Sequence, residues 1–292
     1  MSEKEIKYSE LKSRKELYKE KYIRVVKKII ANDNIKSLKD LKELKNAGID
    51  LTKVIGSDKY TWNYAAEKGA VNCLEFLLEN FHNLKILKDD KERVFYTILS
   101  STRDTNKMIK MLSFYGKYFK FSNETNNPSQ TPVLTELLKN ELTEVAIYLF
   151  ENGCNLLYVE NEKIISPIEM AIQEYDLYFL KYLKEKHNIS ILDYERKNIP
   201  LFSCIERNSY MQSYILSDKI AMGKFLIDEG VDVYKKNNQN QTALEMIIKQ
   251  CEYIENNGID KLLGILEVYY QQKVLDRQFN NTILENKKII RL

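Results

Sequence analysis

The feature that most constrains this chain is a short sequence pattern that returns at regular intervals through its second half. The segment SPIEMAI at residues 166–172 recurs as IPLFSCI at residues 199–205 and as TALEMII at residues 242–248. A related TPVL segment opens an earlier copy at residues 131–134, with its apolar residues shifted by one position. The starts lie 35, 33 and 43 residues apart, so the period is near 33, with an insertion in the last interval. A fixed period of this length predicts a stack of small repeated units that bury their apolar sides against one another.

The residues after these openings continue the pattern. Residues 221–233, AMGKFLIDEGVDV, are predicted to form a helix that ends at a glycine, an ending that we call a glycine exit. Residues 145–155 end similarly in ENGCN. Another exit, AGIDL, occupies residues 47–51, and residues 60–69 give a further opening. Glycine suits these positions because a helix ends readily at a residue that tolerates positive φ. Together these segments resemble the ankyrin repeat, with five to six copies over roughly residues 36–270.

The resemblance implies an all-α, ankyrin-like helical repeat solenoid. We expect a helical N-terminal cap or degenerate repeat over residues 1–35, one continuous array over residues 36–270 and a C-terminal cap or tail over residues 271–292. Residues 93–116 are too diverged to align with the other copies. The histidine usual at the fourth position of the opening is also replaced, so we expect uneven geometry between repeats. The replacing residues are Asn63, Glu169, Phe202 and Glu245.

Composition limits where such a chain can work. No run of about 18 apolar residues is present, so we expect no membrane span. The N-terminus lacks the apolar core of a secretory signal, which favours the cytoplasm or delivery into a host cytosol. The cysteines are widely spaced, and we expect buried structural thiols. They are Cys73, Cys154, Cys204 and Cys251.

The net charge of +3 is unevenly distributed. Residues 1–30 carry ten basic and five acidic side chains, and residues 272–292 carry five and two, which leaves the middle mildly acidic. Basic ends could bind nucleic acid or a nucleoprotein. Mixed charges are also typical of a solvated helix face, and a nucleic-acid footprint is normally single-signed.

Catalysis has little support in the sequence. The chain has only two histidines, and the spacing motifs for zinc, a nucleophile elbow or a phosphate-binding loop are absent. Asp89, Asp90 and Glu92 form an acidic group that we place in a loop between repeats. We therefore expect no enzyme activity, no cofactor and no metal site.

Two insertions and the tyrosines are the most individual features. Residues 117–130 are predicted to form a polar loop that begins with aromatic residues. Residues 208–218 are predicted to lengthen the turn between the two helices of one repeat. The second insertion is apolar enough either to fold back or to meet a partner. We expect Tyr148, Tyr178 and Tyr182 to pack on second helices.

The resemblance also implies a site, because ankyrin-like stacks present first helices and hairpin tips on a concave face. We expect a monomer that binds a protein partner there, as an inhibitor or scaffold, with nucleic-acid or nucleoprotein binding as the alternative. The candidate contact residues are Tyr60, Glu67, Lys68, Tyr118, Phe119, Tyr158, Glu174, Arg196, Arg207, Tyr210, Tyr214, Tyr234 and Lys249.

Overall fold

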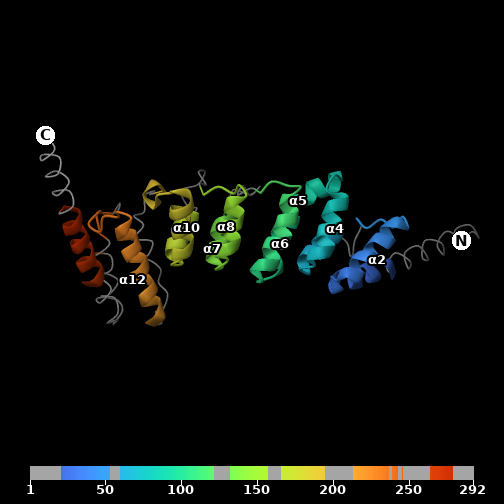
Figure 1. Ribbon diagram of the computed structural model, residues 1–292, viewed down its shortest axis with the longest axis horizontal. Helices are drawn as coiled ribbons and strands as arrows, with labels where there is room; N and C mark the ends of the chain where they lie inside the picture. Colours follow the sequence, from blue (N-terminus) through green and yellow to red (C-terminus); the bar gives the residue numbers. More distant parts are fainter. Residues whose placement is uncertain are drawn as a thin grey trace, which may run out of the picture. The chain divides into compact units, whose positions relative to one another are not determined.

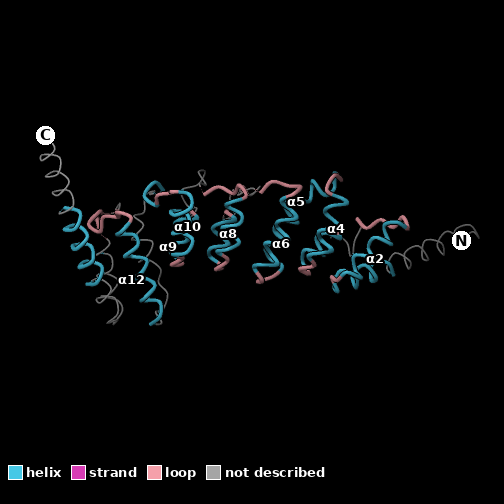
Figure 2. The backbone as a smooth tube through the Cα atoms, in the orientation of Figure 1, coloured by secondary structure: helices cyan, strands magenta, loops and turns pink. Residues whose placement is uncertain are grey.

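The structure is a computed structural model of the 292-residue chain. It describes residues 21–52, 60–121, 132–156, 166–194, 213–236, 239–242, 245 and 264–278. Within these ranges, residues 193–194 and 213–216 are described by their backbone alone. The chain divides into two compact units, Met1–Phe121 and Ser122–Leu292, which we describe separately. All regular elements in the described ranges are helices (Figure 1), joined by loops and turns (Figure 2).

The first unit is a series of helix pairs, and each pair forms one repeat. Within the pairs, α3 packs on α4 and α5 packs on α6. Between repeats, the first helix α3 packs on the first helix α5. The second helix α4 lies between α2 and α6 and packs on both (Figure 1). The buried faces are aliphatic and aromatic, which supplies the main stabilisation of each helix. In order, the elements are a helix at residues 21–32, α2 Ile35–Asn46, α3 Thr61–Glu67, α4 Val71–Phe81, α5 Lys85–Ser101 and α6 Thr105–Gly116.

Local signals explain where these helices begin and end. The side chain of Asn34 caps α2 by accepting a hydrogen bond from the Ser37 N–H, at 2.9 Å. Asp104 caps α6 in the same way, accepting from the Lys107 N–H at 3.0 Å. Such caps satisfy backbone donors that have no partner within the helix. Gly48 follows α2 with φ of 78°, which confirms the predicted glycine exit.

Asp33 joins the first repeat to the second. Its carboxylate accepts hydrogen bonds from the Asn72 N–H, at 3.2 Å, and the Cys73 N–H, at 2.8 Å. These donors belong to the first turn of α4, so an acidic side chain from the preceding repeat caps this helix. The negative charge also complements the positive end of the helix dipole.

The second unit repeats the paired arrangement. Helix α7 packs on α8 and α9, and α10 packs on α8 and α9. Gly153 and Gly230 follow α8 and α12 with φ of 104° and 102°, as expected for the predicted exits. In order, the described elements are α7 Val133–Lys139, α8 Thr143–Glu151, α9 Pro167–Gln173, α10 Leu177–His187, a 3-10 turn Ile191–Tyr194, α12 Ser213–Asp228 and a helix at residues 264–278.

Polar caps again link neighbouring repeats. Ser166 caps α9 by accepting from the Glu169 N–H at 3.1 Å. Asp176 caps α10, accepting from the Phe179 N–H at 2.9 Å, and its carboxylate also accepts a hydrogen bond from the Thr143 hydroxyl at the start of α8. Asp176 thus caps the second helix of its own repeat and also bonds to the second helix of the preceding repeat.

Two predictions about local structure were wrong. The insertion at residues 208–218 was predicted to lengthen the turn between two helices, but residues 213–218 are helical and belong to α12, while residues 208–212 lie outside the described residues. These residues contain neither glycine nor proline, so the helix extends backwards without interruption. Tyr178 was expected to pack, but its side chain is 63% exposed on α10.

The described cysteines agree with the prediction of buried structural thiols. Cys73 and Cys154 are free and buried. Burial raises the pKa of the Cys154 thiol to about 12, and burial together with Asp33 raises that of Cys73. Both groups are therefore held in the inert thiol form. Cys204 and Cys251 lie outside the described residues.

Candidate functional site

The exposed side of α3 carries a tyrosine ring flanked by two lysines. The ammonium groups of Lys27 and Lys68 lie 5.8 and 5.5 Å from the centroid of the Tyr64 ring. Lys68 and its neighbour Glu67 are both exposed, with a loose ion pair of 4.0 Å between them. The predicted contact residues Glu67 and Lys68 therefore lie together on the surface at the C-terminal end of a first helix, beside an aromatic ring that was not among the predicted contact residues.

The neighbouring first helix, α5, presents a second tyrosine. Tyr96 is 37% exposed and packs edge-on against Phe95 at a centroid distance of 5.5 Å. Asp89, Glu92 and Arg93 precede it at helical spacing and are exposed on the same side. This side of α5 thus combines an aromatic ring with charges of both signs.

A buried polar link holds α3 against α5. The Asp90 carboxylate accepts hydrogen bonds from Trp62 Nε1, at 2.8 Å, and from Asn63 Nδ2, at 2.6 Å. Asn63 stands at the position where the family resemblance implies histidine, and it keeps a role in linking repeats. The link fixes the spacing between the exposed sides that carry Tyr64 and Tyr96.

The acidic group containing Asp89 and Asp90 was predicted to lie in a loop, and this was wrong. Helix α5 runs from Lys85 to Ser101 without a glycine or proline. Its buried residues Leu87, Val94 and Ile98 recur at helical spacing, so the helix continues through the acidic group. The carboxylates lie along a helix, and Asp90 points to the preceding repeat.

Three predicted aromatic contact residues of the first unit are partly engaged within the unit. Tyr60 stacks on Trp62 at a centroid distance of 4.8 Å. Tyr118 stacks on His82 at 4.2 Å, and Phe119 lies 5.0 Å from the Tyr115 ring. All three side chains are half-buried.

In the second unit Tyr234 packs beside Tyr270. The ring centroids lie 5.4 Å apart in an edge-to-face arrangement, and Tyr234 is 45% exposed. The Tyr270 hydroxyl donates a hydrogen bond to Asp232 at 3.1 Å. Glu174, the other described candidate here, is half-buried at the end of α9.

The remaining predicted contact residues have no described side chains. Tyr214 lies in α12, of which the structure describes only the backbone at that point. The candidates outside the described residues are Tyr158, Arg196, Arg207, Tyr210 and Lys249.

Within the described ranges, no three His, Cys, Asp or Glu side chains gather closely enough to hold a metal ion. In the same ranges, no helix is both long and apolar enough to cross a membrane.

Comparison with known proteins identifies the fold. No protein-family model matches the sequence, and no curated protein matches it. Among solved structures, the ankyrin repeat domain of Bcl-3 is similar over 75% of this chain and 92% of its own, with a TM-score of 0.51 and 13% identity. The human ASB11 ankyrin repeat domain matches over 76% and 90%, with a TM-score of 0.46 and 17% identity. A chain from the complex of the predatory endopeptidase Bd0816 from Bdellovibrio bacteriovorus with immunity protein Bd3460 matches over 82% and 96%, with a TM-score of 0.38 and 18% identity.

This chain has the ankyrin-repeat fold. The repeat pairs of the two units are ankyrin repeats, with α3, α5, α7 and α9 as first helices. The match to Bcl-3 rests on structure, because the identity is only 13%.

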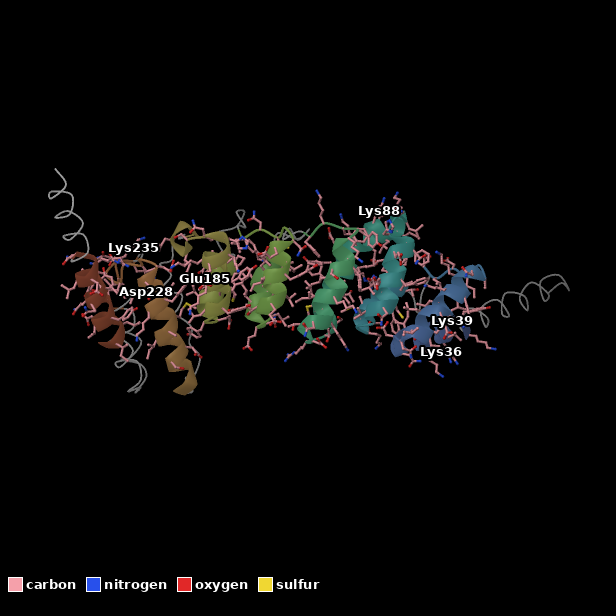
Figure 3. The ribbon with its side chains drawn as sticks, in the orientation of Figure 1. Lys36, Lys39, Lys88, Glu185, Asp228 and Lys235 are labelled. Carbon is pink, nitrogen blue, oxygen red and sulfur yellow. The ribbon has the colours of Figure 1, made fainter. Side chains whose placement is uncertain are left out.

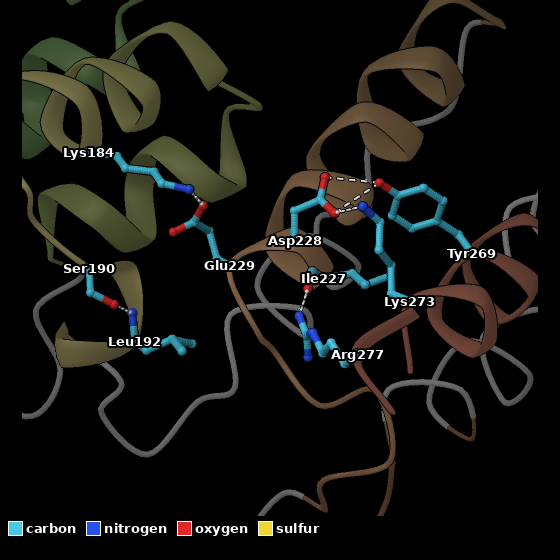
Figure 4. Close-up of polar contacts among 9 residues, drawn as sticks. All are labelled: Lys184, Ser190, Leu192, Ile227, Asp228, Glu229, Tyr269, Lys273 and Arg277. Atoms are coloured by element: carbon cyan, nitrogen blue, oxygen red, sulfur yellow. Dashed lines mark hydrogen bonds and ion pairs between the residues drawn. The ribbon is translucent and has the colours of Figure 1, made fainter. Parts of the chain in front are cut away.

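A charged cluster connects the end of α12 to the helix at residues 264–278 (Figure 4). The Tyr269 hydroxyl lies 2.9 Å from both carboxylate oxygens of Asp228, and Lys273 Nζ lies 2.8 Å from one of them. Arg277 donates to the Ile227 carbonyl at 3.1 Å. Partial burial tends to raise the pKa of Asp228, but the bonds from Lys273 and Tyr269 outweigh it and lower that pKa below its ordinary value.

We expect this cluster to make the stability of the second unit depend on acidity. Because the folded-state pKa of Asp228 is lowered, its stabilising contribution is present above the ordinary carboxyl pKa of 3.8 and is lost as the pH falls through the folded value. Asp228→Asn should therefore lower the melting temperature at neutral pH, and the deficit should close in acid. Thermal melts followed by circular dichroism across this range measure it. Glu185→Gln, at an exposed glutamate on α10 (Figure 3), is the control and should show no such pattern; a deficit for Asp228→Asn that stays constant with pH would contradict the assignment.

Proposed function

We propose that this chain is a non-enzymatic binding module that holds a protein partner on its first helices and the loops beside them. The observation that carries the proposal is a pair of tyrosines, the half-buried Tyr64 and the exposed Tyr96, which lie among charged side chains on adjacent first helices. Asp90 fixes the two helices against each other, so this surface is organised before a partner arrives. Preorganised groups lose less conformational entropy on binding.

The composition of this surface supports a protein as the partner. Tyrosine and arginine are enriched among the residues that contribute most to protein interfaces, and Arg93 precedes Tyr96 by one helical turn. Charges of both signs, here Glu67, Lys68 and Asp89, are typical of the polar rim of such an interface. A monomer that inhibits or scaffolds its partner in the cytosol is consistent with this arrangement and with the buried free thiols.

The test is capture of a partner by tagged protein from a lysate of its own source, followed by mass spectrometry. The comparison is with Tyr64→Ala/Tyr96→Ala, checked by circular dichroism for intact folding. We expect one stoichiometric protein, with capture by the variant reduced at least about tenfold because hot-spot tyrosines each contribute more than about 1 kcal/mol.

The matched control is Tyr178→Ala, which removes a more exposed tyrosine from the second helix α10. It should leave capture unchanged. If the folded double variant captures the partner as well as the parent protein does, or if Tyr178→Ala is equally harmful, the first-helix surface is not the site.

Nucleic-acid binding is the second candidate function. It is favoured by the basic residues of the described N-terminal segment, where residues 21–52 carry eight basic and four acidic side chains. The same capture experiment, run with and without nuclease, separates the two. Nucleic-acid binding predicts loss of capture after nuclease treatment and a steep decline in affinity with salt.

A further inference from the structure

The helix at residues 21–32, the first described element of the first unit, carries a positive charge. The helix at residues 21–32 carries four basic and no acidic side chains. Lys36 and Lys39 on the neighbouring helix α2 extend into solvent and add to the positive charge (Figure 3). The region therefore favours a partner with negative charge.

Nearby carboxylates only partly neutralise this surface. Asp33 is committed to the backbone of Asn72 and Cys73, and Asp50 accepts from the Thr52 N–H at 3.0 Å. Glu43 forms only a loose 4.0 Å pair with Lys39. Among the described residues an excess of positive charge remains, because residues 21–52 carry eight basic and four acidic side chains.

Lys27 and Lys68 are the most organised part of the surface. Their ammonium groups approach the same ring, Tyr64, from two different helices. Among the described residues, no carboxylate lies within ion-pair distance of Lys27, and Lys68 has only Glu67 at 4.0 Å. Cation–π contacts hold both groups in place without cancelling their charge, so they can both pair with carboxylates.

Apolar side chains accompany these charges. Val25, which is 42% exposed, lies between Lys21 and Lys28 on the exposed side of the helix at residues 21–32. Tyr22 is also exposed, at 46%. A phosphate backbone offers no counterpart for an exposed valine, whereas a peptide offers both carboxylates and apolar side chains.

We propose that this surface, made of Lys21, Arg24, Val25, Lys27 and Lys28 with Tyr64 and Lys68 of α3, binds an acidic segment of a partner protein that also carries apolar residues. Carboxylates of the segment pair with Lys27 and Lys68, whose ammonium groups both lie over the Tyr64 ring. An apolar side chain packs on Val25. This inference rests on the proposed protein-binding function and specifies the chemistry of the partner.

The test uses short fluorescein-labelled peptides and fluorescence anisotropy with the full chain at low salt. The probe is a peptide of glutamate and leucine; its controls are a glutamine and leucine peptide and an oligothymidylate. We expect the acidic peptide to bind, and Lys27→Glu/Lys68→Glu to weaken this binding by roughly tenfold or more, because two favourable charge pairs become repulsive. The neutral peptide should not bind measurably.

The matched charge control is Lys139→Glu/Lys181→Glu, at exposed lysines of α7 and α10. It makes the same change in net charge and should leave the affinity for the acidic peptide close to that of the parent protein. Equal weakening by both variants would show that only net charge matters and would overturn the proposal. Absence of binding by the acidic peptide, or binding of oligothymidylate alone with sensitivity to Lys27→Glu/Lys68→Glu, would also overturn it.

Partner capture separates this inference from the proposed function. If Lys27→Glu/Lys68→Glu captures the partner normally while Tyr64→Ala/Tyr96→Ala does not, the chain binds a protein but not through an acidic segment on this surface. If neither variant affects capture, both proposals are wrong. Loss of capture in both, with both variants folded, supports both.

Discussion

Replacing Trp62 by alanine is expected to lower the free energy of unfolding of the first unit by about 3–5 kcal/mol. The indole is fully buried on α3, stacks on Tyr60 and donates to Asp90. Removing it leaves a cavity between two repeats and leaves the carboxylate with fewer donors. Urea unfolding followed by circular dichroism measures the change, and the first unit should unfold at lower urea concentration.

Two variants show how the effect arises. Trp62→Phe keeps most of the packing but removes the indole N–H, so its loss of stability should be clearly smaller. Tyr178→Ala removes an exposed aromatic side chain and should change stability by no more than about 0.5 kcal/mol, as surface substitutions usually do. If Trp62→Ala were as mild as Tyr178→Ala, the buried position of the indole would be wrong.

Replacing Asp90 by alanine is expected to cost about 2–4 kcal/mol, because two hydrogen-bond donors lose a charged acceptor. These donors are Trp62 Nε1 and Asn63 Nδ2, which both meet one carboxylate oxygen of Asp90. The loss should appear in the same urea transition. Partner capture should also weaken, because the spacing of Tyr64 and Tyr96 depends on this link.

The adjacent aspartate provides the matched control for this prediction. Asp89 is exposed on the same helix, and Asp89→Ala should change stability by less than about 0.5 kcal/mol. Asp90→Asn keeps one acceptor oxygen and should lie between the two. Equal effects of Asp89→Ala and Asp90→Ala would contradict the buried link.

The repeated part of the fold was predictable because its signals are local. Glycine exits such as Gly48, Gly153 and Gly230 mark helix ends through backbone conformation, and each adopts the positive φ that this role requires. The opening at residues 60–69 predicts α3 and the start of α4 for the same reason. Local chemistry of this kind can be recognised in a single copy and is strengthened by its recurrence.

The link between repeats could not be predicted, because it depends on residues distant in sequence. Asp90 and Trp62 are 28 residues apart, and nothing in either segment identifies the other as its partner. The divergence of residues 93–116 also hid the extent of α5, so its acidic residues were assigned to a loop. The unbroken helical spacing of Leu87, Val94 and Ile98 was the signal that could have corrected this.

The candidate surface was only partly predictable for a related reason. Glu67 and Lys68 were selected from their place at the end of a first helix, and they are exposed there. Tyr64 was missed because its significance depends on Lys27, which comes from another helix. Tyr96 was missed because it lies in the repeat that could not be aligned. Assignment of these residues as a binding site remains a prediction.

The most direct test of the central claim is zero-length carbodiimide cross-linking of the chain to its captured partner, which joins lysine ammonium groups to carboxylates. First helices α3 and α5 carry exposed Lys68, Lys85 and Lys88, whereas second helix α6 of the same unit carries exposed Lys107 and Lys110. We predict that mass spectrometry finds partner cross-links at the lysines of α3 and α5. Cross-links confined to Lys107 and Lys110 would contradict binding on the first helices.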